Sequence, residues 1–169
     1  MSESEIQYLA YPGHVITDRP VRSMDYGNCV GTVLIGTGVH HAVTHYSLPR
    51  SCEEVVRQYA EDTEAVRNFA LSLLAKLLTP EEYIPRLQME LHEDILGCVQ
   101  FGGDEEHMER VRTICTQQKI PLLAEVKRDS LKHLFYNPNT KEIFLKQPDI
   151  GQTLYWRYGQ QGFIGIPNA

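Results

Sequence analysis

The strongest constraint on the fold lies in two apolar, β-branched runs that flank a short glycine turn. The runs are Val30 to Ile35 and Val39 to Tyr46, and the turn is Gly36-Thr37-Gly38. Residues of this kind favour strands, and glycines supply the backbone freedom that a tight reversal needs. We therefore expect an antiparallel hairpin, in which the end of the second run returns alongside the start of the first.

Reactive side chains lie at both ends of this expected hairpin. Cys29 directly follows Gly27-Asn28, a dipeptide typical of turns, and His45 lies near the end of the second run. A nearby imidazole can take the proton of a thiol and leave a nucleophilic thiolate. Such a base needs a third group to hold its tautomer, and the upstream hydroxyl of Ser23 is the candidate.

These residues resemble the chemoreceptor glutamine deamidase family, CheD. Its members carry a threonine, then a Gly-Ser-Cys turn at matching spacing, and a His-x-x-Leu-Pro motif after the next strand. The corresponding residues here are Ser23, Gly27-Asn28-Cys29 and His45-Tyr46-Ser47-Leu48-Pro49. The similarity continues in order to Lys146. It implies that Cys29 is the nucleophile, His45 the base and Ser23 the orienting hydroxyl, with Gly27 and Asn28 positioning the oxyanion or the substrate.

The resemblance also implies an activity and partners. The reaction would be hydrolysis of a protein glutamine to glutamate and ammonia through a thioester, with methylesterase action on receptor glutamates by the same acyl chemistry. The substrates would be cytoplasmic segments of chemoreceptors, and the phosphatase CheC would bind as a regulator. No metal or organic cofactor is required.

The chain departs from the family pattern at several positions, which leaves two alternatives. Asn28 replaces the serine beside the nucleophile, Ser23 replaces the threonine, and residues 126–132 lack the family's glycine-rich segment. A non-catalytic adaptor in chemotaxis signalling that keeps the deamidase shape is the first alternative. The second is a metal site formed by His41, His45 and Cys29, since alternation along a strand places both histidines on one face.

The order of the expected elements indicates an α+β fold. The 169 residues, 42% of them hydrophobic and 22% charged, suit one globular domain. The resemblance sharpens this expectation to two mixed β-sheets packed face to face with flanking helices. It assigns residues 1–147 to a CheD-like domain and leaves residues 148–169 as a tail that packs on the domain or on a partner. An added edge strand is the plain interpretation of the tail, and a substrate mimic at Gln160-Gln161 is the bolder one.

Helix signals occur in two places. Ser51-Cys52-Glu53-Glu54 fits a capping box that starts a long helix ending near Leu78, whose apolar stripe should face a core. Asp104 should cap a second helix. The remaining expected strands include 96–101, 121–126, 131–136 and 143–146, and the first of them ends at Gly102-Gly103, where another backbone can approach closely.

Charge and hydropathy limit the environment and the partners. The net charge of −6 argues against a broad surface that binds nucleic acid. A local basic patch is compatible with the sequence around four residues, Lys127, Arg128, Lys132 and His133. No apolar run reaches membrane-spanning length and the N-terminus lacks a secretory pattern, so we expect a cytoplasmic protein without membrane insertion. The four cysteines lack C-x-x-C spacing, which disfavours a disulfide framework or a thiolate metal cage.

Overall fold

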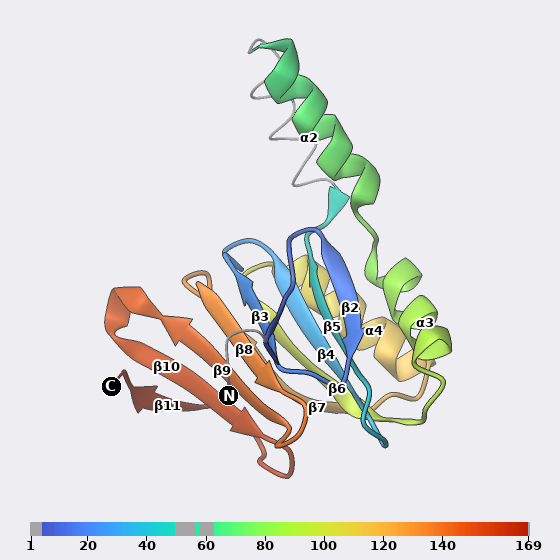
Figure 1. Ribbon diagram of the computed structural model, residues 1–169, viewed down its shortest axis with the longest axis vertical. Coiled ribbons are helices and arrows are strands. Elements are labelled where there is room, and N and C mark those ends of the chain that lie inside the picture. Colours follow the sequence, from blue (N-terminus) through green and yellow to red (C-terminus); the bar gives the residue numbers. More distant parts are fainter. Residues whose placement is uncertain (1–4, 50–56, 58–62, 169) are drawn as a thin grey trace.

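Two β-sheets form the body of the protein in the computed structural model, which describes residues 5–49, 57 and 63–168. The six-stranded sheet contains, in spatial order, β1 (Gln7–Tyr8), β3 (Val21–Met24), β8 (His133–Asn137), β9 (Glu142–Gln147), β10 (Gln152–Arg157) and β11 (Ile164–Pro167). The five-stranded sheet contains β2 (Gly13–Thr17), β5 (His41–Tyr46), β4 (Val30–Gly36), β6 (Ile95–Gly102) and β7 (Leu122–Lys127). Each sheet is mixed, because β1 runs parallel to β3 and β6 parallel to β7 while the other pairs are antiparallel. The α+β expectation with two mixed sheets is confirmed (Figure 1).

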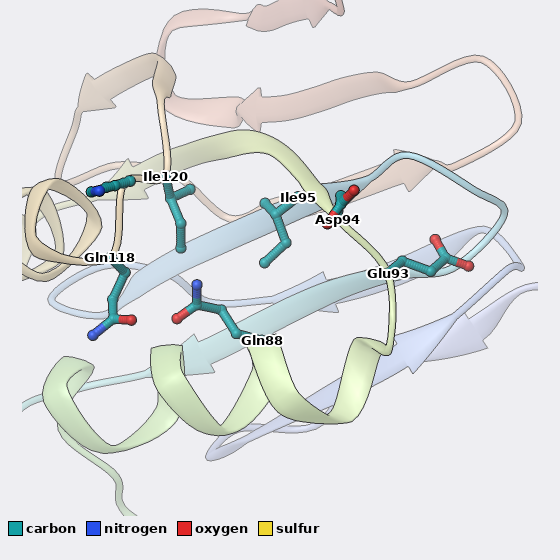
Figure 2. A pocket seen from close by; sticks show the side chains of 7 residues that line it. Gln88, Glu93, Asp94, Ile95, Gln118 and Ile120 are labelled. Carbon is teal, nitrogen blue, oxygen red and sulfur yellow. The ribbon is translucent and has the colours of Figure 1, made fainter.

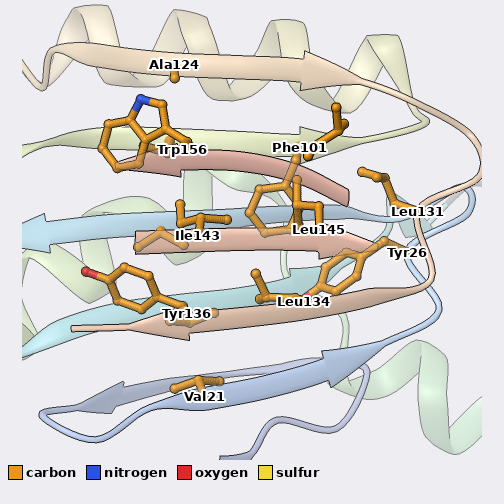
Figure 3. Close-up of a cluster of buried hydrophobic side chains, with 14 of the residues drawn as sticks. Val21, Tyr26, Phe101, Ala124, Leu131, Leu134, Tyr136, Ile143, Leu145 and Trp156 are labelled. Carbon is orange, nitrogen blue, oxygen red and sulfur yellow. The ribbon is translucent and has the colours of Figure 1, made fainter. Parts of the chain in front are cut away.

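The main core lies between the two sheets. Val33, Val43 and Val99 of the five-stranded sheet pack in one cluster with Leu134 and Trp156 of the six-stranded sheet. Figure 3 shows buried side chains of this cluster, among them Phe101 and Ala124 of the five-stranded sheet and Leu134 and Trp156 of the six-stranded sheet. Alternation along each strand sends every second residue into this core and its neighbours to the opposite face.

Helices cover the other face of the five-stranded sheet. The helices α3 (Pro80–Leu91) and α4 (Glu105–Gln117) pack on its strands and enclose a second core (Figure 1). The expected cap of α4 is confirmed, since the Asp104 carboxylate accepts a hydrogen bond from the His107 amide at 3.2 Å. The helix α3 was not predicted from the sequence, although Thr79 and Glu82 form a capping box at its start.

The helix α2 (Glu64–Lys76) is more exposed than its sequence predicted. Its apolar stripe was expected to face a core, but none of its residues is buried and Phe69 is 65% exposed. Figure 1 shows the helix projecting away from the two sheets. Apolar periodicity identifies one face of a helix, but it does not supply a surface to cover that face. The expected capping box at 51–54 lies outside the described residues.

The C-terminal residues 148–168 belong largely to the six-stranded sheet. After the 3-10 turn η2 (Pro148–Ile150), β10 pairs with β9, and β11 pairs with β10 at the sheet edge. Trp156 is 1% exposed in the main core, and its indole N–H donates to the Gln160 carbonyl. The Gln160 side-chain amide donates to the carbonyls of Tyr155 and Gly162, so it is held within its own turn. Within the described part of the chain, no helix is both long and apolar enough to span a membrane.

Loss of the Trp156 side chain is expected to destabilise the whole fold. Trp156→Ala should lower the free energy of unfolding by about 3–5 kcal/mol, because it removes a large side chain from between the sheets. Tyr158→Ala is the matched control, since Tyr158 is 43% exposed on the same segment. Urea denaturation measures both variants, and equal stability of the two would contradict this placement of the tail.

Candidate active site

The predicted hairpin is present and brings the Cys29 end of β4 beside the His45 end of β5. The strands are antiparallel, with Gly31 directly opposite His45. Alternation places Cys29, Gly31 and His45 on the same side of the sheet, facing the six-stranded sheet. Cys29 directly precedes β4, whose first pair is Val30 with Tyr46, so it lies at the end of the strand pair that carries His45, and its thiol makes no hydrogen bond to Nε2 of His45. Cys29 is partly exposed and packs against the main core.

Ser23 and His45 form a hydrogen bond from one sheet to the other. The Ser23 hydroxyl on β3 lies 2.9 Å from Nδ1 of His45 on β5, and both residues are 1% exposed. The same hydroxyl donates its single hydrogen to the Leu9 carbonyl at 2.7 Å. Because that hydrogen is used, Ser23 can only accept from His45, which requires the proton on Nδ1. This tautomer leaves a lone pair on Nε2, as a general base needs.

Burial keeps the His45 ring neutral. The pKa of His45 is lowered to about 4, first because burial penalises the charged ring, while the backbone and carboxylate of Asp25 partly offset the effect. Its Nε2 atom is buried and has no hydrogen-bond partner among the described residues. Among the described residues, Nδ1 of His107 and the side-chain oxygens of Gln100 and Gln147 are likewise buried without a partner.

Two tyrosines fix the orientation of the His45 ring. Tyr26 stacks on it with ring centroids 3.8 Å apart and an interplanar angle of 15°, and Tyr11 lies at 5.1 Å. A β-carbon built on Gly31 would lie 2.7 Å from a ring carbon of Tyr26 and closer still to a ring carbon of Phe101, so a side chain there would collide with both rings. Tyr26 was not predicted as a residue of the site. The available signal was an aromatic residue between Ser23 and Cys29, together with a glycine opposite His45.

The loop that carries Cys29 is fixed by the end of β6. The Gly103 amide donates to the Cys29 carbonyl at 3.2 Å, and a side chain on Gly102 or Gly103 would collide with the backbone of residues 27–30. Gly102 also has a φ of 149°, which glycine adopts readily. The prediction that these glycines allow close approach of another backbone is confirmed.

The backbone amide of Cys29 already has a hydrogen-bond partner. The Cys29 amide donates to the Tyr26 carbonyl at 3.0 Å, so this N–H is already used. The two positions expected to aid it, Gly27 and Asn28, lie in the same turn, with Gly27 half-buried and Asn28 exposed. A donor for the oxyanion therefore has to come from Asn28, or from a rearrangement that releases the Cys29 amide.

The structure separates the residues of the metal-site alternative. His41 lies four positions from His45 on β5, about 13 Å along the strand. Its Nδ1 is 2.9 Å from the Tyr136 hydroxyl, and burial lowers its pKa to about 4. Across residues 5–49, 57 and 63–168, no group of three or more His, Cys, Asp or Glu side chains could hold a metal ion. His41 thus contributes to the core rather than to a site with Cys29.

A separate hollow of about 360 Å³ lies where α3, β6 and α4 end or begin. It is lined by Gln88, Glu93, Asp94, Ile95, Gln118, Lys119 and Ile120 (Figure 2). None of the candidate catalytic residues contributes to this lining.

The sequence matches no protein-family model, and no curated protein matches it.

Acid is expected to destabilise the protein through its buried histidines. Burial lowers the pKa values of His41, His45 and His107 to about 4, against 6.5 for an unperturbed ring. Between these pH values the unfolded chain binds more protons than the native state, so stability must fall as the pH is lowered. The loss should approach about 1.4 kcal/mol per pH unit for each histidine. Urea denaturation from neutral pH down to pH 4.5 measures it.

NMR titration of the imidazoles provides a direct check at His45. Its ring should stay neutral, with the proton on Nδ1, until the pH approaches about 4. Titration near the ordinary value, or a proton on Nε2, would contradict the geometry described above.

Proposed function

We propose that this chain is a cysteine-dependent protein-glutamine deamidase. The observation that carries the proposal is the buried Ser23–His45 hydrogen bond, whose tautomer leaves Nε2 of His45 as a proton acceptor. The partly exposed Cys29 directly precedes β4, at the end of the strand pair where Gly31 lies opposite His45. A thiol, a neutral imidazole and a hydroxyl that fixes its tautomer are the groups that acyl transfer requires.

The proposed reaction has two halves. Nε2 of His45 takes the Cys29 proton, and the thiolate adds to the carbon of the glutamine side-chain amide. His45 then returns the proton to the departing nitrogen, the C–N bond breaks, and ammonia leaves behind a thioester. In the second half, His45 removes a proton from water, whose oxygen attacks the thioester. The Cys29 thiol is regenerated and the product is glutamate.

Burial of His45 favours the step of each half-reaction in which the imidazolium gives its proton to the leaving atom. An imidazolium in this site is unstable, since burial lowers its pKa to about 4. The ring therefore gives up its proton readily to the leaving nitrogen or sulfur. Ser23 and the stacked ring of Tyr26 hold the imidazole in one orientation, which saves the entropy of positioning it during the reaction.

The proposed substrates and partners come from the resemblance to CheD. They are glutamines in cytoplasmic segments of chemoreceptors, with CheC as a regulator and receptor glutamate methyl esters as further substrates of the same thioester chemistry. A cytoplasmic location is part of this proposal. The first 147 residues would form the CheD-like unit, with β10 and β11 added at the edge of its six-stranded sheet.

Substitutions at the site should separate the nucleophile from the group that orients the base. Cys29→Ala should abolish the conversion of receptor glutamine to glutamate, measured by mass spectrometry of a chemoreceptor fragment. Ser23→Ala should lower kcat by at least about tenfold, because His45 loses the acceptor that fixes its tautomer. Ser23→Thr retains a hydroxyl and should keep most of the activity. Unchanged activity of Cys29→Ala would refute the proposal.

Alkylation tests activation of the thiol without a substrate. Iodoacetamide at neutral pH should modify Cys29 faster in the native protein than in His45→Gln, because only the native protein has a neutral imidazole that can take the thiol proton as the sulfur is alkylated. The buried Cys98 and Cys115 report any unfolding of the variant. Equal Cys29 rates in the two folded proteins, together with no deamidation, would favour the non-catalytic adaptor.

A further inference from the structure

The six-stranded sheet has one face that the helices leave uncovered. Its inner face packs on the five-stranded sheet, while α3 and α4 pack on the far side of that second sheet (Figure 1). A groove of about 1030 Å³ runs over the outer face of the six-stranded sheet. It is lined by Tyr8, Arg22, Ser23, Met24, His133, Leu134, Phe135, Phe144, Lys146, Thr153, Ile166, Pro167 and Asn168.

Strand register arranges the outer side chains in two rows across the sheet. The first row is apolar and aromatic beyond its initial arginine, and consists of Arg22, Phe135, Phe144, Tyr155 and Ile164. The second row is more polar and consists of Met24, His133, Lys146, Thr153 and Ile166. Each row crosses five strands, a span of about 19 Å at the usual strand spacing.

The first row is an aromatic floor that is already in place. Phe135 and Phe144 have ring centroids 6.1 Å apart, and Phe144 and Tyr155 have centroids 5.0 Å apart. The Arg22 guanidinium lies 5.7 Å from the centre of the Phe135 ring. Tyr155 also donates to the Glu142 carboxylate at 2.6 Å, which holds this acid at the edge of the row. Because these rings are already held by their contacts with one another, apolar side chains of a ligand could pack on them without having to order them first.

The charge of the groove is opposite to that of the protein. Its two fully charged lining residues, Arg22 and Lys146, are both cationic, and His133 lies between them across the strands. Among the described residues no acid lines the groove, and Glu142 at the edge of the aromatic row is bonded to Tyr155. The chain as a whole carries a net charge of −6. A cationic groove in an acidic protein attracts an anionic ligand to this face and repels it from the rest of the surface.

The groove also ends beside the candidate active site. Past Met24 and His133, the pairing of β3 and β8 continues through the hydrogen bonds Asp25 N–H to Lys132 and Tyr26 N–H to Leu131. These residues begin the loop that leads to Cys29. A segment seated in the groove therefore reaches the edge from which the Cys29 loop extends.

We propose that this groove binds an acidic, amphipathic segment of a partner protein. Apolar side chains of the segment would lie on the aromatic row, and its carboxylates would pair with Arg22, His133 and Lys146. A helix of about 13 residues matches the span of the rows. The partner is the glutamine-bearing substrate, an identification that rests on the proposed function. A nucleic acid fits less well, because few cations line the groove and the acidic surface around it repels phosphates.

Binding is measured on the Cys29→Ala protein, so that chemistry plays no part. The probe is a fluorescein-labelled amphipathic peptide of glutamate and leucine, and the control peptide has lysine at every glutamate position. The glutamate peptide should bind, more weakly as salt is raised, and the lysine peptide should not. The double variant Arg22→Glu and Lys146→Glu should weaken binding of the glutamate peptide by at least about tenfold. Reversal of two exposed cations outside the groove, Arg67→Glu and Lys119→Glu, is the matched control.

The proposal is overturned if the glutamate peptide fails to bind, or if it binds the groove variant and the control variant equally. Binding of oligo(dT) in preference to the glutamate peptide would overturn it in favour of a nucleic acid. If the groove variant does not fold, NMR shifts of the Cys29→Ala protein decide, since the peptide must perturb β3, β8 and β9. Failure of the peptide to bind would not change the outcome of the deamidation measurement, and absence of deamidation would not change the outcome of the binding measurement. Each proposal can therefore be refuted without the other.

Discussion

The hydrogen bond between Ser23 and His45 joins the two sheets at the point where the candidate chemistry lies. Both groups are buried, so neither could remain there without a partner except at considerable cost. The Leu9 carbonyl completes the arrangement, because it takes the only hydrogen of Ser23 and thereby fixes which ring nitrogen of His45 carries the proton. Packing of one sheet on the other therefore determines the protonation geometry of the base.

Room for this arrangement comes from glycines that lie opposite aromatic rings. His45 has Gly13 on one neighbouring strand and Gly31 on the other, and the rings of Tyr11 and Tyr26 lie against it. A larger residue at position 31 would displace Tyr26 from its stack. The glycines at the end of β6 act in the same way on the backbone beside Cys29. Small residues around the site thus set the positions of the large ones.

The six-stranded sheet performs a different task on each face. Its inner residues, including Ser23 and Trp156, complete the core and orient the base. Its outer residues, including Arg22 and Phe144, form the cationic and aromatic groove. Since neighbours along a strand point to opposite faces, Ser23 and Arg22 are adjacent in sequence but serve the core and the groove respectively. Ser23 of the candidate site and Arg22 of the proposed docking surface therefore lie on opposite faces of the same strand, β3.

Local sequence was sufficient for the hairpin and for the Asp104 cap, because turn residues, alternation and capping act over a few positions. The choice of Cys29, His45 and Ser23 as a candidate site rested on these elements together with a family resemblance. Local sequence was not sufficient for the stack of Tyr26 on His45, the open face of α2, or the two rows of the groove. Those features depend on which surfaces meet after folding and which are left uncovered. The candidate reactive groups were thus proposed from the sequence alone. Their tautomer, their burial and the surface beside them were decided only by the tertiary structure, because residues far apart in the chain supply the neighbours that set them.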